Sequence, residues 1–445
     1  QDLGKNHLQD INLRILTGEG GKKRDTANVF HYYKKQPTME VITESGKSIR
    51  GTYNHPLMSL HNDNGTLIRE WKCLDEMKIG DRLATVTSIP CTITKCLDTG
   101  FKQVPRKYGP KFKGKLPKKL DEDLAAFMGY VLGDGWVRKY EVGFVVAEDE
   151  IDILKKLVKI SEKLFSKKPR IEKRIIKPTY LGDRPIKRKM PLTYASIDSI
   201  DIAHNLRFLR DNRVPDMVLK SGNKAAASFL KWLYEADGSV FDKGRGNRSI
   251  NLKSRNIELL RDVQILLLRF AIHSRILGGD NLMIRRGESM IKFAKHIGFV
   301  SKKKRTKMKQ LAKSAQKFKR FKSQRSEKIV KIIKHQTEDV YDIEVPKSHR
   351  FIANGIISHN TGKTAMMKLV TGIAPRARYV SGTGTTGAGM TASVIKNEVI
   401  GSWVLEAGAL ILANKSVIGI DEFDKIGRDD QVALHEAMSV ETISM

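Results

Sequence analysis

The chain has 445 residues and a formal net charge of +32, from 81 Lys and Arg against 49 Asp and Glu. This length allows two to four domains, each with its own hydrophobic core. The charge is uneven, because residues 361–445 carry 8 Lys and Arg against 9 Asp and Glu, which leaves 73 against 40 for residues 1–360. Only the first 360 residues are therefore expected to bind a polyanion.

The three cysteines form neither a metal-binding spacing nor a disulfide framework; they are Cys73, Cys91 and Cys96. This usage is typical of a reducing cytoplasm. No signal peptide precedes Gln1, and no apolar run reaches the length of a membrane span. We expect a cytoplasmic, nucleoid-associated protein without a membrane partner.

Residues 1 to about 100 alternate apolar and polar side chains over short stretches, as in residues 38–43 and 82–87. Turn-forming sequences separate these stretches. The pattern predicts small, antiparallel β structure. Thr52 and His55 lie inside it, in the segment TYNHP. A His-Pro pair before a strand is by itself usually a turn.

A strand hairpin is predicted within residues 340–364. It comprises residues 343–345 and 351–357, with a turn at Asn354 and Gly355, a dipeptide typical of tight hairpins. Taken alone, this pattern indicates only a local structural element.

Three reactive residues follow the hairpin, namely His359, Asn360 and Thr361. An Asn amide can attack its own backbone carbonyl, close a succinimide and cut the chain, provided that the leaving nitrogen is protonated. His359 is placed for that acid work. Thr361 supplies a hydroxyl that can accept the upstream segment as an ester before the cut. The tripeptide alone is a weak signal.

The whole block, in order, resembles the C-terminal splicing block of inteins, and implies an all-β Hint splicing domain in which Asn360 cyclises and Thr361 is the acceptor nucleophile. It also implies assisting roles for residues that match the family's blocks, namely Thr52, His55, Asp342, His349 and His359. Inteins of this kind begin with Cys or Ser. Because this chain begins with Gln1, we expect a fragment of a longer precursor that lacks the first block.

Two helical segments carry the same pattern, at residues 124–134 and 229–237. In each, apolar residues at helical spacing lead to an acid followed by glycine. The acids, Asp134 and Asp237, are 103 residues apart, which implies an internal duplication. One copy alone would more often be a core helix that ends at an Asp.

The two copies resemble the LAGLIDADG motifs of DOD-type homing endonucleases, whose two helices pack side by side. Asp134 and Asp237 would then hold Mg²⁺ together with the phosphate being cut in double-stranded DNA. Lys253 matches a lysine near that metal centre, and Glu235 is a secondary candidate. Small residues would allow the close helix approach; they are Ala125, Gly129, Gly133 and Ala236.

Residues 301–334 carry 15 Lys and Arg and a single acid, Glu327. Most of this stretch is interpreted as a basic connector, helical in part around residues 307–318. A solvated linker and a DNA-contacting segment are both compatible with this composition.

Residues 361–364 read TGKT and open a predicted helix over residues 365–370, as the second half of a P-loop does. An apolar strand at residues 416–420 ends in Asp421 and Glu422. With the segments SGTGTTGAGMTA and HEAM, these residues resemble the AAA+ core of archaeal-type MCM replicative helicases, which act as homo-hexamers. The resemblance implies that Glu422 orients the attacking water. It also implies that ATP and Mg²⁺ are bound by Gly362, Lys363, Thr364 and Asp421, with Thr364 and Asp421 on the metal.

The P-loop pattern requires a glycine five residues before Gly362, where this chain has Ile357. We therefore expect the phosphate cradle to stay open until residues 1–360 are removed. ATP hydrolysis is expected only in the spliced, oligomeric product.

We thus expect a multidomain chain. Residues 1–118 and 320–360 would form the two parts of an all-β Hint domain. Residues 119–319 would form an inserted α+β LAGLIDADG endonuclease, and residues 361–445 part of an α/β AAA+ ATPase. Two alternatives remain open: a DNA-binding module with an inactive endonuclease, and a chain that acts chiefly as a helicase ATPase after splicing.

Overall fold

The computed structural model divides the chain into two compact units, residues 1–360 and residues 361–445, and each is described by itself. Described residues of the first unit are 8–18, 23–63, 66–91, 93, 96–105, 112–174, 179–181, 184–186, 191–244, 248–315 and 326–360. Those of the second unit are 374–381, 387–396, 402–421, 426, 427, 431, 434 and 438.

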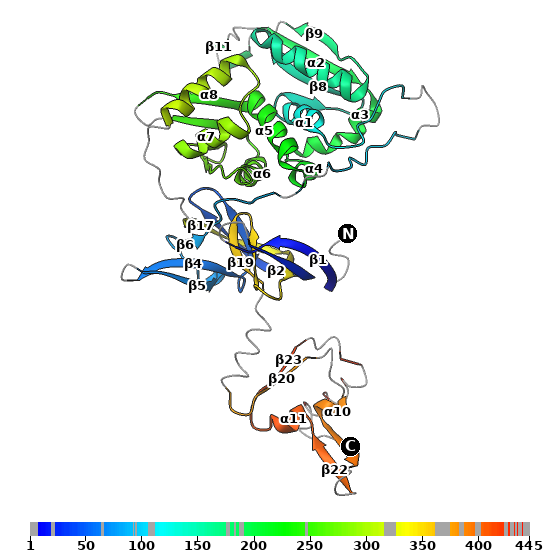
Figure 1. The fold of residues 1–445 in the computed structure, drawn as a ribbon, viewed down its shortest axis with the longest axis vertical. Helices are drawn as coiled ribbons and strands as arrows, with labels where there is room; N and C mark the ends of the chain where they lie inside the picture. Colours follow the sequence, from blue (N-terminus) through cyan, green and yellow to red (C-terminus); the bar gives the residue numbers. More distant parts are fainter. Residues whose placement is uncertain are drawn as a thin grey trace. The chain divides into compact units, whose positions relative to one another are not determined.

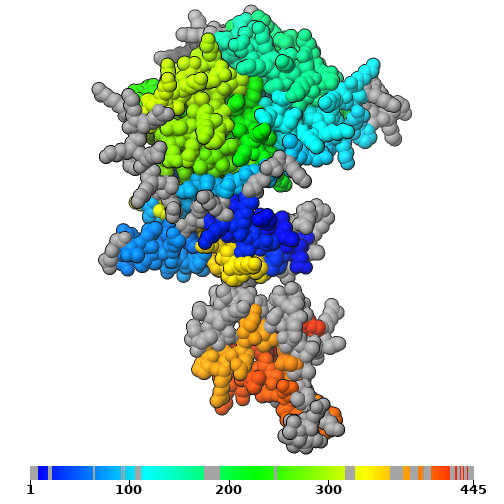
Figure 2. All heavy atoms as spheres, in the orientation of Figure 1, coloured from blue at the N-terminus to red at the C-terminus, as the bar shows by residue number. Residues whose placement is uncertain are grey.

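A nine-stranded antiparallel sheet joins the beginning and the end of the first unit. Its longest strands, β2 (Arg24–Thr43) and β17 (Ser326–Glu344), pair from Ile329 opposite Thr43 to Glu344 opposite Val29. Figure 2 shows residues from the end of the first unit, in yellow, packed against residues from its beginning, in dark blue. Strands before residue 90 and after residue 325 therefore share one sheet.

The strand order of this sheet is β1-β2-β17-β6-β4-β19-β18, with β3 on β2 and β5 on β4. Cores on this sheet bury Val41, Leu57, Leu74 and Ile356 in one cluster, and Met58 and Ile357 in another. The remaining strands and the short helix η1 have these bounds: β1 Leu8–Leu16, β3 Ser48–Thr52, β4 Pro56–Asp63, β5 Thr66–Cys73, η1 Leu74–Glu76, β6 Arg82–Ala84, β18 Arg350–Ala353 and β19 Ile356–His359.

The middle of the first unit contains two four-stranded sheets with the same topology. The first sheet has the order β7-β8-β12-β9 and the second has β13-β14-β16-β15, so in both the fourth strand lies between the second and the third. A helix precedes each sheet, α1 (Glu122–Asp134) before the first and α5 (Asn223–Asp237) before the second. The two segments are therefore structural repeats.

Strands of the repeats are β7 Gly135–Val137, β8 Glu141–Ala147, β9 Arg170–Arg174, β12 Leu192–Asp198, β13 Gly238–Asp242, β14 Arg248–Lys253, β15 Arg275–Leu277 and β16 Asn281–Ile284. A separate hairpin has the strands β10 Thr179–Leu181 and β11 Arg184–Ile186. Helices are η2 Glu148–Glu150, α2 Ile151–Phe165, α3 Ile200–Asn205, η3 Arg207–Asp211, α4 Asp216–Leu219, α6 Ile257–Leu268, α7 Gly287–His296 and α8 Lys302–Ala315.

Helices α1 and α5 pack side by side at the centre of the repeats (Figure 1). A methyl group at Gly129 would lie 2.3 Å from the carbonyl oxygen of Phe229, so only glycine fits that crossing. The helices are apolar on several sides and bury Phe127, Tyr130 and Trp232 in one continuous core. Burial of this kind, rather than helix propensity, holds such a helix pair together.

Residues 301–334 are helical in part, as predicted, but the helix is packed against the core and is not a solvated linker. Helix α8 begins at Lys302 and ends at Ala315, and it buries Met308 and Leu311 in the core of the repeats. Strand β17 then begins at Ser326. Lysines dominate the helix surface, and they hide from the composition the few apolar residues that dock it.

The described part of the second unit combines a parallel and an antiparallel strand pair. β20 (Arg378–Ser381) runs parallel to β23 (Ile418–Asp421), and β21 (Ala392–Lys396) pairs antiparallel with β22 (Trp403–Ala407). Two short helices, α10 (Gly387–Met390) and α11 (Ala409–Leu412), accompany them. Within the described residues, no helix has the length and apolar character needed to cross a membrane.

Candidate functional site

The β18–β19 hairpin carries the first group of candidate residues. Its turn is at Asn354 and Gly355, as the dipeptide predicts, with φ of +50° and +81°. The two strands are Arg350–Ala353 and Ile356–His359, whereas residues 343–344 belong to β17, so the predicted strand bounds were wrong on that side. Arg350 lies opposite His359, which places the end of the hairpin at Asn360.

His359 lies directly against the peptide carbonyl that follows it. Its Nδ1 is 2.5 Å from the carbonyl oxygen of Asn360, and because the oxygen can only accept, Nδ1 carries the proton. Trp71 of β5 packs edge-on against the His359 ring, with 4.7 Å between centroids. Burial lowers the pKa of His359, the Asn360 carbonyl raises it, and the neighbouring His349 lowers it again.

The side chain of Asn360 is buried and clamped by the loop before the hairpin. With the amide oriented to satisfy both partners, Nδ2 donates to the His349 carbonyl at 2.5 Å and Oδ1 accepts from the Val345 backbone N–H at 3.2 Å. The backbone N–H of Asn360 also donates to the His349 carbonyl, at 3.1 Å. His349 has a φ of +51°, an uncommon conformation that aims its carbonyl at Asn360.

His55 and Asp342 belong to the same cluster. Both side chains are buried, and Asp342 accepts from the backbone N–H of Ile343 at 2.8 Å. Burial lowers the pKa of His55, whereas the charge of Asp342 raises it and that of His359 lowers it. Thr52 ends β3, and its carbonyl accepts from the His55 backbone N–H at 2.9 Å. His55 and Asp342 therefore lie near His359, and Thr52 lies beside His55.

A second group lies where α1 and α5 end. Asp134 and Asp237 are the last residues of their helices. A methyl group at Gly133 would lie 2.5 Å from Cβ of Ala236 and 3.2 Å from a carboxylate oxygen of Asp237, so this close approach brings the two helix ends together. The predicted acid pair is therefore one site.

Both carboxyl groups are harder to ionise than usual. Burial, followed by the charge of Asp134, raises the pKa of Asp237 to about 6. The loss of surrounding solvent also raises the pKa of Asp134, although part of its surface still faces solvent. The negative ends of two helix dipoles meet at the same point, which adds to the cost of two negative charges. A cation bound there would remove that cost.

The positive charge of Lys304, on α8, acts on both acids. It lowers their pKa values and so offsets part of the rise that burial causes. Lys304 donates to the backbone carbonyl of Glu235, and its Nζ lies 3.8 Å from the Glu235 carboxylate. Glu235 is fully buried and accepts from the backbone N–H groups of Val300 at 2.5 Å and Ser301 at 3.0 Å. Glu235 therefore anchors the start of α8.

Lys253 is an exposed residue at the end of β14. Its neighbour Leu252 pairs with Gly238, the residue after Asp237, so Lys253 lies on the strand next to the second acid. The role assigned to it from the sequence stays a prediction.

The acid pair suits Mg²⁺ by its donor set. In the parts of the chain that the structure describes, no group of three or more His, Cys, Asp and Glu side chains could hold a metal. Mg²⁺ is commonly held by one or two carboxylates plus waters and substrate phosphates, so two oxygen donors at a solvent-open position fit this ion. Asp134 and Asp237 would hold it.

Several sequence-predicted residues of the second unit lie outside the described residues: Thr361, Gly362, Lys363, Thr364 and Glu422, together with the predicted helix over residues 365–370. Asp421 ends β23, opposite Ser381 of the parallel strand β20. An acid at the carboxyl end of a parallel strand is the position where α/β sheets bind ligands.

Two neighbours of the sites were not assigned from the sequence. Trp71 is not among the residues predicted from the sequence, and Lys304 lies in the stretch 301–334, which the sequence marks only as basic. A Trp before a turn and a Lys among lysines carry no individual signal. Their roles depend on contacts between segments that are far apart in the sequence.

Two family models match the chain. An intein splicing domain covers residues 7–360, and an MCM P-loop domain covers residues 356–445. Among curated proteins, the chain is 46% identical over 85 residues to the minichromosome maintenance protein MCM of Saccharolobus solfataricus, which is 19% of this chain and 12% of the relative.

It is also 49% identical over 86 residues to the DNA replication licensing factor mcm6 of Schizosaccharomyces pombe, and 51% identical over 86 residues to the zygotic DNA replication licensing factor mcm6-A of Xenopus laevis. Each of these matches covers 19% of this chain and 10% of the relative. The chain thus spans about a tenth of the length of the curated relatives it matches. The chain belongs to the intein splicing-domain family, and this domain is followed by a segment of an MCM P-loop domain.

Proposed function

We propose that residues 1–360 excise themselves by protein splicing and that Asn360 makes the final cut. Its Nδ2 forms a bond to its own carbonyl carbon, and the bond from that carbon to the nitrogen of Thr361 breaks. The amide proton leaves through solvent while His359 delivers a proton to the departing nitrogen, so atoms and charges balance. Before this step, the Thr361 hydroxyl accepts the upstream segment as an ester.

The observation that carries this proposal is the contact of 2.5 Å between Nδ1 of His359 and the carbonyl oxygen of Asn360. A donor at this distance withdraws electrons from the carbonyl that is attacked. The clamp of His349 and Val345 holds the amide in place. Asp342 would supply negative charge and His55 a hydrogen-bonding ring next to His359. Thr52 and His55 would also act at the upstream junction.

Mass spectrometry of the purified chain tests the cut. A fragment that begins at Thr361 should accumulate from the wild type and be absent from Asn360→Ala. Asn62→Ala, at an exposed position of β4, is the matched control and should cleave like the wild type. Equal release from Asn360→Ala would overturn the proposal.

A second activity is favoured by the acid pair at the joined ends of α1 and α5. We infer that Asp134 and Asp237 hold Mg²⁺ and cut both strands of an uninterrupted copy of the host coding sequence, as LAGLIDADG enzymes do. The bound ion would neutralise the phosphate and lower the pKa of an attacking water. Lys253, on the neighbouring strand, would contact the reacting phosphate.

Cleavage of linear duplex DNA that contains the uninterrupted host sequence tests this activity. Asp134→Asn and Asp237→Asn should each abolish cutting and retain most binding, because binding depends on the basic surface. Asp152→Asn, at an exposed position of α2, is the control. Cutting by either site variant would refute the paired-carboxylate site. An inactive DNA-binding module would bind DNA without cutting it.

The C-terminal segment would serve an ATP-dependent DNA helicase once it is joined to upstream host residues. Gly362, Lys363, Thr364 and Asp421 would bind Mg²⁺ and ATP, Glu422 would orient the water, and the host would act as a homo-hexamer on chromosomal DNA. In the present chain Ile357 stands where the P-loop glycine belongs. Calorimetric titration with Mg·ATP should therefore show negligible binding. Micromolar binding would show that the half-loop suffices.

A further inference from the structure

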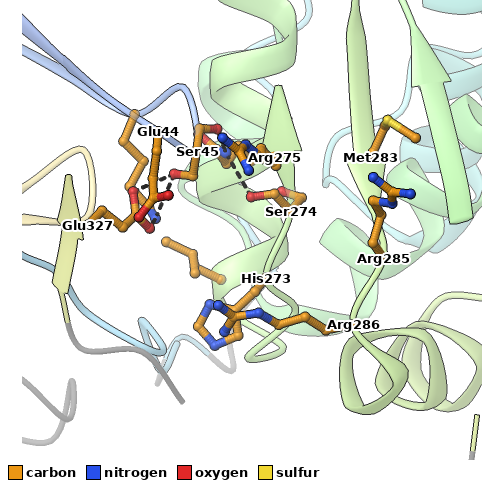
Figure 3. Close-up of a pocket in the computed structure, with 12 residues that line it drawn as sticks. Glu44, Ser45, His273, Ser274, Arg275, Met283, Arg285, Arg286 and Glu327 are labelled. Atoms are coloured by element: carbon orange, nitrogen blue, oxygen red, sulfur yellow. Dashed lines mark hydrogen bonds and ion pairs between the residues drawn. The ribbon is translucent and has the colours of Figure 1, made fainter. Parts of the chain in front are cut away.

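A cavity of about 210 Å³ lies between the nine-stranded sheet and the second repeat. One wall comes from the β2–β3 turn and the start of β17, and the other from α6, β15 and β16 with their adjoining loops. Figure 3 shows Glu44, Ser45 and Glu327 on one side, and His273, Arg285 and Arg286 across from them.

Hydrogen bonds to backbone carbonyl groups connect the two walls of the cavity. Ile276 donates its N–H to the Ser45 carbonyl at 2.9 Å, and Nε2 of Gln264 donates to the same carbonyl at 2.9 Å and to the Ser274 carbonyl at 3.1 Å. A methyl group at Gly46 would lie 2.8 Å from Cβ of Ile276. The cavity is therefore bounded by two elements that are in direct contact.

The wall formed by the nine-stranded sheet is nearly neutral. Lys47, which is buried, forms an ion pair with Glu327. Glu327 also accepts from Ser45 Oγ at 2.5 Å and Thr43 Oγ1 at 2.7 Å, so its charge is well compensated. Glu44 remains as the second carboxylate of the lining.

The wall formed by the second repeat is strongly basic. It contributes Arg275, Arg285 and Arg286. In the described part of the chain, the side chains of Arg275 and Arg285 have no ion pair, and both are exposed. The guanidinium groups of Arg275 and Arg285 outweigh the single charge of Glu44, so the lining of the cavity is net positive. Guanidinium groups match the geometry of phosphate oxygens.

A neutral donor completes the lining. Oγ of Ser274 is buried and has no hydrogen-bond partner among the described residues, which is costly unless a ligand supplies one. Next to it, burial and the charges of Arg286 and Lys47 lower the pKa of His273 to about 4, so its imidazole is neutral near pH 7. Positive charge around His273 thus disfavours a further cation and favours an anion.

The cavity is continuous with one face of the second sheet. Arg275 pairs with Met283, and Arg285 follows Met283 by two residues, so these three side chains share a face. The opposite face buries Ile276 and Leu282 in the core. Because β14 of this sheet pairs with the strand that starts after the second acid, the open face leads from the cavity toward the proposed cleavage site.

We propose that this cavity binds a backbone phosphate of duplex DNA, so that the splicing domain and the second repeat share one DNA contact. Arg275 and Arg285 pair with the phosphate oxygens, and Ser274 donates its hydroxyl proton to one of them. The proposal rests on the proposed endonuclease function, because it assumes that duplex DNA lies along the sheet face.

Binding of the full chain to duplex DNA, measured without Mg²⁺ over a range of salt concentrations, tests this contact. The double variant Arg275→Gln, Arg285→Gln should lower the magnitude of the slope of log K against log salt by about 0.9, the value for one lost phosphate contact, and each single variant should give part of that loss. Arg285→Lys should keep the slope. Arg69→Gln, exposed on β5 and outside the cavity, should bind like the wild type.

Three outcomes would contradict the account, and they are distinguishable. Wild-type slopes in Arg275→Gln and Arg285→Gln would overturn the phosphate contact and leave the endonuclease standing. Absence of DNA binding by the wild type would overturn both. If the wild type binds inorganic phosphate and both variants lose that binding, while their DNA binding is unchanged, the cavity takes a free anion and not the duplex.

Discussion

His359 donates from Nδ1 to the carbonyl oxygen of Asn360 across 2.5 Å. The donor and acceptor belong to adjacent residues, and the arrangement persists because Trp71 packs against the ring while the His349 carbonyl holds the Asn360 backbone N–H. The proposed cut therefore depends on a local contact that segments distant in the sequence hold in place. This is how a splicing element can carry a reactive bond within a buried cluster.

Replacing His359 should slow cleavage between Asn360 and Thr361. We expect His359→Gln to lower the rate by roughly 10²–10⁴-fold, the usual contribution of a positioned acid. The rate is measured from the appearance of the Thr361 fragment by mass spectrometry. His61→Gln, at an exposed position of β4, should keep the wild-type rate. A wild-type rate in His359→Gln would exclude His359 as the acid.

Cleavage should accelerate as the pH falls. Burial lowers the pKa of His359 below its usual value, so the ring is mostly neutral near pH 7.5 and becomes protonated on acidification. An acid that acts as imidazolium predicts a rate that rises on acidification from neutral pH and levels off once the pH is below the lowered pKa of His359. A pH–rate profile of the purified chain measures this. A rate that falls steadily on acidification would contradict the assignment.

The hairpin turn should be sensitive to its packing as well as to its φ angle. Gly355 has a φ of +81°, and a methyl group there would lie 3.2 Å from Leu268 and 3.3 Å from Lys47. Gly279 has a φ of +77° with nothing within 4 Å, so it is the matched control. Each Gly→Ala change should cost about 1 kcal/mol for the left-handed conformation, with a further ~1 kcal/mol at position 355 from crowding. Urea unfolding measures both. Equal losses would show that the contact has no energetic role.

The acid pair should destabilise the fold at neutral pH. The pKa of Asp237 is about 6 in the folded protein and near 3.8 in the unfolded chain, so the folded state binds more protons between these values. Stability is therefore lost as the pH rises through about 6, by up to about 3 kcal/mol. Asp237→Asn should raise the unfolding temperature at pH 7.5 and bring no gain below about pH 4.

A lower unfolding temperature for Asp237→Asn at neutral pH would contradict this prediction, because it would mean that the ionised carboxylate of Asp237 stabilises the fold. Asp152→Asn, on the exposed face of α2, controls for the general effect of removing a negative charge. Mg²⁺ should stabilise the wild type at pH 7.5 and have less effect on Asp237→Asn, because the ion offsets the same repulsion.

Local chemistry explains what could be predicted from the sequence. Asn354-Gly355 requires positive φ at both positions, which selects one turn. Two helices that end in an acid and contain small residues predict a pair whose acids lie close together. The helix ends do meet at Gly133 and Asp237, and the charge of Asp134 acts on Asp237. These features depend on residue type and spacing alone.

The missed features depend on long-range contacts. Lys304 acts on the acids because Glu235 accepts the N–H groups at the start of α8, 65 residues further along the chain. The composition of α8 resembles that of a linker, because lysines dominate it and only a few apolar residues, such as Met308 and Leu311, pack against the core. The cavity proposed to bind phosphate likewise joins Ser45 to Ser274, a pair that no local pattern connects.

The central claim is that the chain is cut by cyclisation of Asn360, and the intact mass of the released fragment of residues 1–360 tests it most directly. Cyclisation leaves a C-terminal succinimide, so at early times this fragment should be lighter by one water than the same fragment with a free asparagine carboxylate. A fragment that carries the free carboxylate from the first time point would show hydrolysis and contradict the account.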